Sequence, residues 1–531
     1  MHNQEQDERI ERLERLVSQL RSSNEDGTGT PENDTISGWI DTISTSTCIA
    51  AFRLHMLPQF PFLYLPASDG DLTAERPQRD RPFLFRAILC VAASTRTDRM
   101  ARAAEIYRAL CESALLHQNN QGESMDLLLA VLTLAAWGWD YHYYNGGGGI
   151  SLPRLIMLAM SLVGEMRLDK PAPQRLRSMA GFMPGVIQGL DHGHEGSSPT
   201  TGWLSLEQTR AVLGCFVLSS VVSDHFGLMD GLQWTRQMEE GLSALSESKE
   251  CKSDALLVLQ VRIQLLTTKA CEIRKQQEHG ERQGSTPGVA ATLVQIDGLR
   301  SQLQEIQGSL PEAYPEHFQI LQAYISHTEL CILESSTPHL DPSLRAGNAR
   351  AALSAIKICL SNLLALLSPS GLPGGSNISF IHWEQLTHCL TSLQHLLANP
   401  DQTAVVEAND LHPVLFLLGQ FAERLEQLAG VEGAESLADA GEAGKSGEDA
   451  FRALAVGLRK LLEGVRAGGG GTAGEEGVDL GRGENADGDG AAAGDGAGSV
   501  EPNLDVLVPQ KGYFWNKRFW LDKALFSETG E

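Results

Sequence analysis

The chain has few aromatic residues and few basic ones. Of its 531 residues, 6% are aromatic, and 42 Lys plus Arg stand against 67 Asp plus Glu, which gives a formal net charge of −25. Such an acidic chain is repelled by phosphate backbones unless it carries a basic module, and no stretch is dense enough in Lys and Arg to be one. These residues alone are therefore not expected to bind DNA or RNA tightly.

The cysteines are too far apart for a zinc ribbon or a redox motif. Nine occur, the two nearest being Cys251 and Cys271, and no C-x-x-C is present. Their odd number and apolar surroundings predict reduced, buried thiols in an intracellular protein. The charged N-terminus is not a secretory signal, and the longest apolar run, Leu127 to Trp137, is too short to span a bilayer. We expect no membrane partner.

Sequence signatures of enzymes are lacking as well. There is no P-loop, no G-x-G-x-x-G after a strand, no H-E-x-x-H and no G-x-S-x-G. Asp191 to Glu195 (DHGHE) lies in a Gly/Ser loop that does not preorganise ligands. Asn485 to Gly490 resembles the start of an EF-hand, but the twelfth position is Gly496. We therefore assign no catalytic, cofactor-binding or metal-binding residue, and expect that the chain is not an enzyme.

What the sequence does have is helical periodicity, from about Asp41 to Ala429, without alternation typical of strands. The fold class is predicted to be all-α. Met125 to Trp139 is apolar on all faces and should lie in the middle of the core. The pattern predicts helices at Arg81 to Ala93, Met125 to Trp139, Leu152 to Met166, Leu206 to Val222, Ala255 to Ile273, Leu293 to Leu310, His317 to Leu333, Pro342 to Leu367, Ile378 to Ala398 and His412 to Leu428. Pro311 should end the sixth of these.

Composition divides the chain further. Residues 467–500 are rich in Gly, Ala and acids and should be disordered, because they cannot bury enough apolar area to offset chain entropy. The segment after them regains aromatic residues. The expected organisation is a short coiled coil (1–23), a linker (24–40), a large helical body (41–429), a helical or linker segment (430–466), the disordered region (467–500) and an aromatic C-terminal segment (501–531).

The coiled coil is expected near the N-terminus. Ile10, Leu13, Val17 and Leu20 are spaced as the a and d positions of a two-stranded coiled coil, with Arg and Glu around them. Two heptads are few for a stable dimer, so a solvated amphipathic helix is the alternative. With the first interpretation, these four residues are dimerisation residues and the protein is a homodimer.

Three stretches in order carry a resemblance to a known family. They are FRLHMLPQFPFLYLP (Phe52 to Pro66) with RDRPFLFRAILCVAAS (Arg79 to Ser94), GESMDLLLAVLTLAAWGWDYHY (Gly122 to Tyr143) and LEQTRAVLGCFVLSSVVSDHFG (Leu206 to Gly227). This part of the chain resembles the all-helical "middle homology" regulatory domain of fungal-type binuclear zinc cluster transcription factors. The resemblance covers roughly Trp39 to Cys271, and more loosely the chain to about Leu428.

The resemblance implies a transcriptional regulator of RNA polymerase II genes in the nucleus. In that family a six-cysteine cluster holding zinc precedes a linker, a dimerising coiled coil and the regulatory domain. This sequence lacks the C-x-x-C-R-x-x-K-x-x-C run, so no zinc ligand can be assigned to any residue here. Either the cluster lies upstream of a truncated chain, or this is a regulator without its own DNA reader. DNA is expected as a partner by resemblance only, and the transcription machinery or a coactivator as another.

Alternatives remain at two points. The acidic region followed by the aromatic tail, Gly512 to Phe526, is either an activation segment that folds on a coactivator or a helix that docks its aromatics on the body. For the whole chain, a regulatory or scaffold protein without a DNA reader is one alternative to the zinc cluster factor. A helical enzyme acting on an apolar metabolite is another alternative, and the predicted helical fold is the one feature that supports it.

Overall fold

A computed structural model was analysed, and it describes twelve segments of the chain. The predicted dimerisation residues Ile10, Leu13, Val17 and Leu20 lie outside them, as do the loop at 191–201, the low-complexity residues after 469 and the aromatic tail. The described residues are 42–65, 81–93, 96–116, 121–138, 151–170, 204–248, 250–283, 289–313, 317–367, 378–398, 408–436 and 450–469.

The described residues are helical and contain no strand, which confirms the all-α fold class. The regular helices are α3 (Thr42–Ala51), α5 (Pro82–Val91), α6 (Arg96–Leu116), α7 (Gln121–Trp137), α9 (Leu152–Glu165), α12 (Leu206–Phe226), α13 (Arg236–Glu247), α14 (Asp254–Gln283), α15 (Val289–Ala313), α16 (Phe318–Ser336), α17 (Pro342–Leu366), α18 (Phe380–Ala398), α20 (Ala408–Ser436) and α21 (Ala450–Gly469). Short helical turns occur at η1 (Phe52–Met56), η2 (Leu57–Gln59) and η4 (Thr337–His339).

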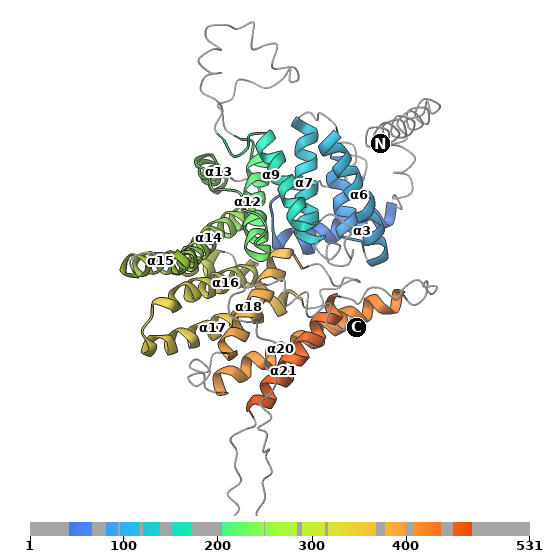
Figure 1. Ribbon diagram of the computed structural model, residues 1–531. Coiled ribbons are helices and arrows are strands. Elements are labelled where there is room, and N and C mark those ends of the chain that lie inside the picture. The colour runs from blue at the N-terminus through green and yellow to red at the C-terminus, as the bar shows by residue number, and fades with distance from the viewer. Residues whose placement is uncertain are drawn as a thin grey trace, which may run out of the picture.

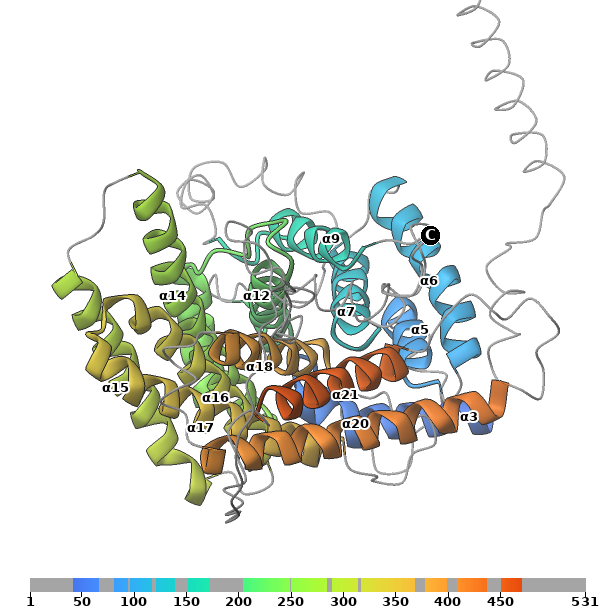
Figure 2. The ribbon, with the colours of Figure 1, turned by 60° about the horizontal axis from the view of Figure 1, so that its bottom comes forward.

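Helices that follow one another in sequence mostly pack against one another in space. The series α5, α7, α9, α12, α14, α16, α17, α20 and α21 is connected by such contacts (Figure 1). Helices α20 and α21 run side by side along one edge (Figure 2). Helix α18 breaks the sequential order, because it contacts α7 and α12 as well as α16 and α17. It therefore joins the N-terminal and C-terminal helices of the body.

Helix α7 lies at the centre of the N-terminal helices, as its apolar sequence predicts. Its residues from Leu127 to Trp137 are buried, and the Trp137 ring lies 5.1 Å from that of Phe52 and 6.0 Å from that of Phe62. Asp126 accepts hydrogen bonds from the backbone N–H groups of Phe83 and Leu84, at 2.8 and 2.9 Å. These are free N–H groups of the first turn of α5, so α7 caps its neighbour.

Helix α12 passes through the middle of the body and is buried along most of its length. It begins with a capping box, in which Ser205 and Gln208 exchange hydrogen bonds, and it ends at Gly227 in the left-handed conformation. At Gly214 the helix approaches the chain near Phe62 so closely that an added Cβ would lie 2.6 Å from the Phe62 Cβ. Only glycine allows this contact.

A polar link joins distant parts of the chain through Gln59 of η2. Its backbone carbonyl accepts a hydrogen bond from Gln260 Nε2 of α14 at 2.7 Å, and its side-chain Oε1 accepts one from the Ser379 backbone N–H at 2.9 Å. All three groups are buried. The turn at residue 59 is thereby fixed against α14 and against the start of α18.

The structure differs from the sequence prediction at several helix ends. The predicted end at Leu310, before Pro311, is wrong by three residues, because α15 continues to Ala313. Burial of Leu310 in the core holds this last turn in place despite the proline. Helices α3, α6, α13 and α21 were not among the individual helices predicted. Helix α21 ends at Gly469, so the prediction that the disordered region begins at residue 467 is wrong by three residues. Helix α20 extends beyond Leu428 to Ser436 and packs against α21.

Among the described residues, one helical segment is long and apolar enough to cross a membrane. It is Leu344–Leu366, within α17. In this body it packs against α16 and α20.

The nine cysteines are all free thiols, seven of them buried, with Cys111 and Cys251 partly exposed.

Candidate functional site

Two helices present histidine, cysteine and glutamate side chains to each other in the body. On α16, His327, Cys331 and Glu334 are spaced so that they share one face, and on α18 Glu384 and His388 do the same. We call His327, Cys331 and His388 the His–Cys cluster; all three are buried. Its ligand atoms all lie within 4.8 Å of one another.

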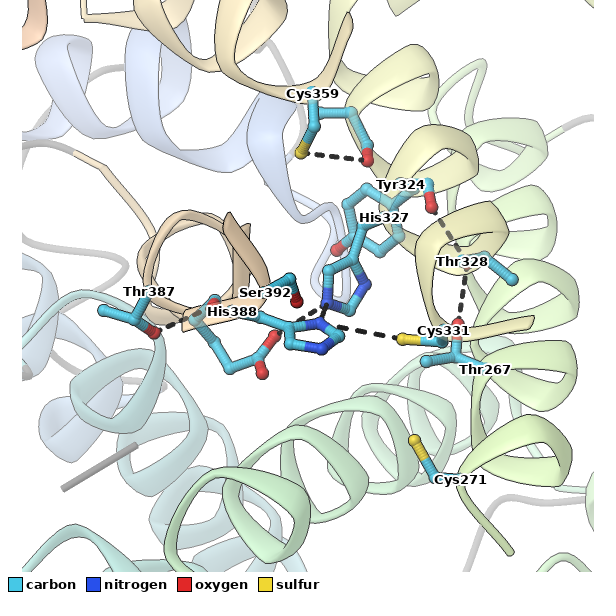
Figure 3. Close-up of polar contacts among 12 residues, drawn as sticks. Thr267, Cys271, Tyr324, His327, Thr328, Cys331, Cys359, Thr387, His388 and Ser392 are labelled. Atoms are coloured by element: carbon cyan, nitrogen blue, oxygen red, sulfur yellow. Dashed lines mark hydrogen bonds and ion pairs between the residues drawn. The ribbon is translucent and has the colours of Figure 1, made fainter. Parts of the chain in front are cut away.

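His388 lies between the other two members of the cluster, as Figure 3 shows. Its Nδ1 is 2.8 Å from His327 Nε2 and 3.7 Å from Cys331 Sγ. Its other nitrogen, Nε2, is 3.0 Å from Glu334 Oε2. An ionised carboxylate can only accept, so Nε2 of His388 carries a hydrogen. In the tautomer with that hydrogen alone, Nδ1 directs its lone pair at the cluster.

Glu334 is held in the ionised form by its neighbours. Burial alone would raise the pKa of this carboxyl group, but His388, Arg274 and the Ser392 hydroxyl hold the pKa well below its ordinary value. Arg274 of α14 donates to Oε2 at 2.7 Å, and Ser392 of α18 donates to Oε1. Glu334 thus connects α14, α16 and α18 and fixes the tautomer of His388.

Two further groups surround the His–Cys cluster. Glu384 Oε2 lies 3.4 Å from His327 Nε2. Cys271 projects from α14 toward the same region (Figure 3), and its hydrogen bond to Cys331, with burial, raises the pKa of the Cys331 thiol. Both cysteines and both histidines line a small cavity of about 10 Å³, which is roughly the room for the centre of one water molecule.

Sequence reasoning, which assigned no metal-binding residue, did not find this cluster. Cys331 and His388 are 57 residues apart and come from different helices. A signal was present, since H-x-x-x-C-x-x-E on one amphipathic stretch and E-x-x-x-H-x-x-x-S on another each place polar side chains on one helical face. The loops that sequence analysis considered and rejected, Asp191 to Glu195 and Asn485 to Gly490, lie outside the described residues.

Comparison with known proteins shows what the chain is similar to. No protein-family model matches the chain, and no solved structure matches it. The chain is similar to a protein named "Transcription factor" from Aspergillus terreus, with 30% identity over 380 residues, covering 68% of this chain and 52% of that protein. It is also similar to "Transcription factor opdL" of Penicillium oxalicum, with 29% identity over 440 residues, covering 79% of this chain and 70% of the relative.

A third relative is "Transcription factor pbcR" of Emericella nidulans, 28% identical over 244 residues, which are 44% of this chain and 30% of that protein. The chain therefore spans about half the length of the first relative and less than a third of pbcR. Homology to proteins named as fungal transcription factors supports a role in transcriptional regulation at the level of the family.

Proposed function

We propose that the chain is a nuclear regulator of RNA polymerase II transcription whose helical body is the regulatory domain of a zinc cluster factor. The observation that carries the proposal is the similarity to opdL over 440 residues, because an alignment of this length cannot be confined to one helix or motif. The three stretches of the family resemblance supply α5, α7 and α12, which pack as the N-terminal part of the body.

DNA recognition in this proposal comes from a zinc cluster outside these 531 residues or from a partner that carries one. The net charge of −25 and the absence of a six-cysteine run in the sequence argue against DNA binding by the chain alone. Ile10, Leu13, Val17 and Leu20 would pair two copies. The acidic region and the aromatic tail would contact a coactivator or the transcription machinery.

A reporter experiment tests the proposed function. The full chain is fused to a heterologous DNA-binding domain and directed to a promoter with sites for that domain, once with basal and once with high activity. The fusion should change expression from either promoter relative to the DNA-binding domain alone, and it should have no effect when the sites are deleted. An expressed, nuclear fusion that leaves both promoters unchanged would contradict a regulatory function.

A mobility-shift experiment tests the DNA-binding part separately. The purified chain should not retard duplex DNA at physiological salt, because its charge opposes binding. Tight, sequence-specific retention would show a DNA-binding surface within the chain. An inactive fusion would instead favour a scaffold function. Turnover of an apolar metabolite by the pure chain would favour an enzyme.

A further inference from the structure

We propose that the His–Cys cluster is a zinc site, in which Nε2 of His327, Sγ of Cys331, Nδ1 of His388 and Oε2 of Glu384 bind the ion. This inference is independent of the zinc cluster discussed above, because it concerns residues of the helical body. It rests on the chemistry of the donors, their geometry, the groups around them and the balance of charge.

The donors are those that zinc prefers. Imidazole nitrogen, thiolate sulfur and carboxylate oxygen are the ordinary zinc ligands, and a site with four protein ligands is typical of structural zinc. Sulfur also disfavours magnesium and calcium, which take oxygen ligands. All four residues are buried and lie on two helices that are already packed together. Little ordering is therefore needed to bring the ligands to the ion.

The distances approach those of a tetrahedral site. Zn–N and Zn–S bonds of about 2.0–2.3 Å place neighbouring ligand atoms roughly 3.3–3.8 Å apart. Two separations lie in or near this range, 3.7 Å from His388 Nδ1 to Cys331 Sγ and 3.4 Å from His327 Nε2 to Glu384 Oε2. The three atoms of the His–Cys cluster already lie within 4.8 Å of one another, whereas Glu384 is outside that group and its carboxylate must turn toward the ion. The two imidazoles are nearer, at 2.8 Å, because they share a hydrogen bond. An ion would separate them by roughly half an ångström.

Glu334 completes the arrangement as a positioning residue. A histidine that binds a metal usually donates its other N–H to a carboxylate, which fixes the ring and makes the ligand nitrogen more basic. Glu334 accepts from Nε2 of His388, so that Nδ1 of the same ring faces the cluster. Arg274 and Ser392 hold Glu334 in turn.

The charges of the site also fit a divalent cation. When zinc is bound, Glu334, Glu384 and the Cys331 thiolate carry three negative charges, and Arg274 with the ion carries three positive ones. Asp224, which also borders the cavity, is paired with Lys275 at 2.9 Å and adds no net charge. Buried charges need such compensation.

Binding involves one proton release. Zn²⁺ displaces the thiol proton of Cys331, and the Zn–S bond replaces the S–H bond while the proton leaves to water. His327 stays neutral, since its hydrogen moves from Nε2 to Nδ1 as Nε2 takes up the ion. Because the ligands come from α16 and α18, the bound ion would cross-link the helices that join the two ends of the body.

The experiment uses the full chain without an affinity tag. Protein treated with a chelator and dialysed is titrated with Co²⁺ and then with Zn²⁺. We expect a single metal ion per chain, a cobalt–thiolate absorption band that zinc abolishes, and a higher melting temperature with zinc. A purified chain that binds neither metal, or binds cobalt without the thiolate band, would overturn the proposal.

Variants assign the ligands. Cys331→Ser should lose the cobalt–thiolate band and the rise in melting temperature, whereas Cys359→Ser should retain both. Cys359 is the matched control, because it is a buried cysteine whose thiol donates to the Ala323 carbonyl and which lies outside the His–Cys cluster. Glu334→Gln should keep the band but weaken cobalt affinity by about 10–100-fold, as loss of such outer partners does. Retention of the cobalt–thiolate band in Cys331→Ser would refute the assignment of Cys331 as a ligand. If the Cys331→Ser variant does not fold, His388→Gln is the second variant to be measured.

Discussion

Arg210 on α12 donates two parallel hydrogen bonds to Asp254, the first residue of α14. Nε is 2.7 Å from Oδ1 and Nη2 is 2.8 Å from Oδ2, and both residues are 2% exposed. Burial by itself would lower the pKa of Arg210. The hydrogen bonds to Asp254 and Glu250 outweigh this effect, so the pKa is raised above its ordinary value. The pair fixes α12 to the next long helix in the interior.

Breaking this pair should be costly. Asp254→Asn leaves a buried guanidinium without its full countercharge, so we expect the free energy of unfolding to fall by about 3–5 kcal/mol. Glu250→Gln removes the other, half-exposed partner of Arg210 and should cost less than about 1 kcal/mol. Urea denaturation followed by circular dichroism measures both. If both variants lost the same free energy of unfolding, the burial of Asp254 would not explain the strength of its pairing with Arg210.

The Asp126 carboxyl group should make stability depend on pH. Burial raises its pKa from 3.8 to about 6, against the hydrogen bonds from Leu84 and Phe83. Between about pH 4 and pH 6 the folded state therefore holds a proton that the unfolded chain has released. The contribution of this group to stability declines as pH rises through that window, by up to about 3 kcal/mol.

Asp126→Asn tests this dependence, because an amide does not titrate. Urea midpoints measured at a series of pH values should show a flatter dependence between about pH 4 and pH 6 in the variant than in the native chain. The variant also weakens the cap on α5, so a uniform loss of stability is expected in addition. The same slope in both proteins would mean that Asp126 is not the titrating group.

Gly214 should not tolerate a methyl group. Gly214→Ala places a Cβ 2.6 Å from the Phe62 Cβ, close to the backbone of that residue, so α12 or the Phe62 segment must shift. We expect a loss of about 1–3 kcal/mol. Gly298→Ala in α15 is the matched control, since nothing lies within 4 Å of its added Cβ. That variant should gain about 0.5–1 kcal/mol from helix propensity, and thermal melting compares the two.

The expected dimer depends on the seam formed by Ile10, Leu13, Val17 and Leu20. Leu13→Glu with Leu20→Glu places charges at two of these positions and should shift the chain from dimer to monomer. Analytical ultracentrifugation of the full chain and the double variant measures the change. The seam is short, and association costs at least ~4 kcal/mol, so the isolated peptide should associate no tighter than roughly the high-micromolar to millimolar range. In the full chain the seam therefore matters only if the helical body also self-associates. The same mass in both proteins would leave this segment a solvated helix.

Much of the fold could be predicted from local patterns. Helix α7 is apolar on all faces, and α15 has leucines at helical spacing. Both patterns involve residues near one another in sequence, so helix formation and burial could be predicted from them. The helices missed individually include α6, which is rich in charge and weakly amphipathic, so its pattern gives little signal. Helix ends were less accurate, because packing of residues such as Leu310 decides them as much as Pro311 does.

The site could not be predicted in the same way. The His–Cys cluster depends on which faces of α16 and α18 meet, and this is decided by packing across the whole body rather than by spacing. Each half of the cluster resembles an ordinary helix face with a buried histidine. The hydrogen bond between Glu334 and His388 is what distinguishes the site, and only the assembled helices show it.

The link through Gln59 has a consequence for how the protein is made. Residues 59 and 379 are 320 positions apart, yet the Ser379 backbone N–H requires the Gln59 side chain as its acceptor. During synthesis, the hydrogen bond between Gln59 and Ser379 cannot form until the start of α18 has been synthesised. Such distant contacts slow folding and leave apolar surfaces exposed meanwhile. A ribosome stalled before residue 378 would therefore hold a nascent chain dependent on chaperones, although most of its helices are already synthesised.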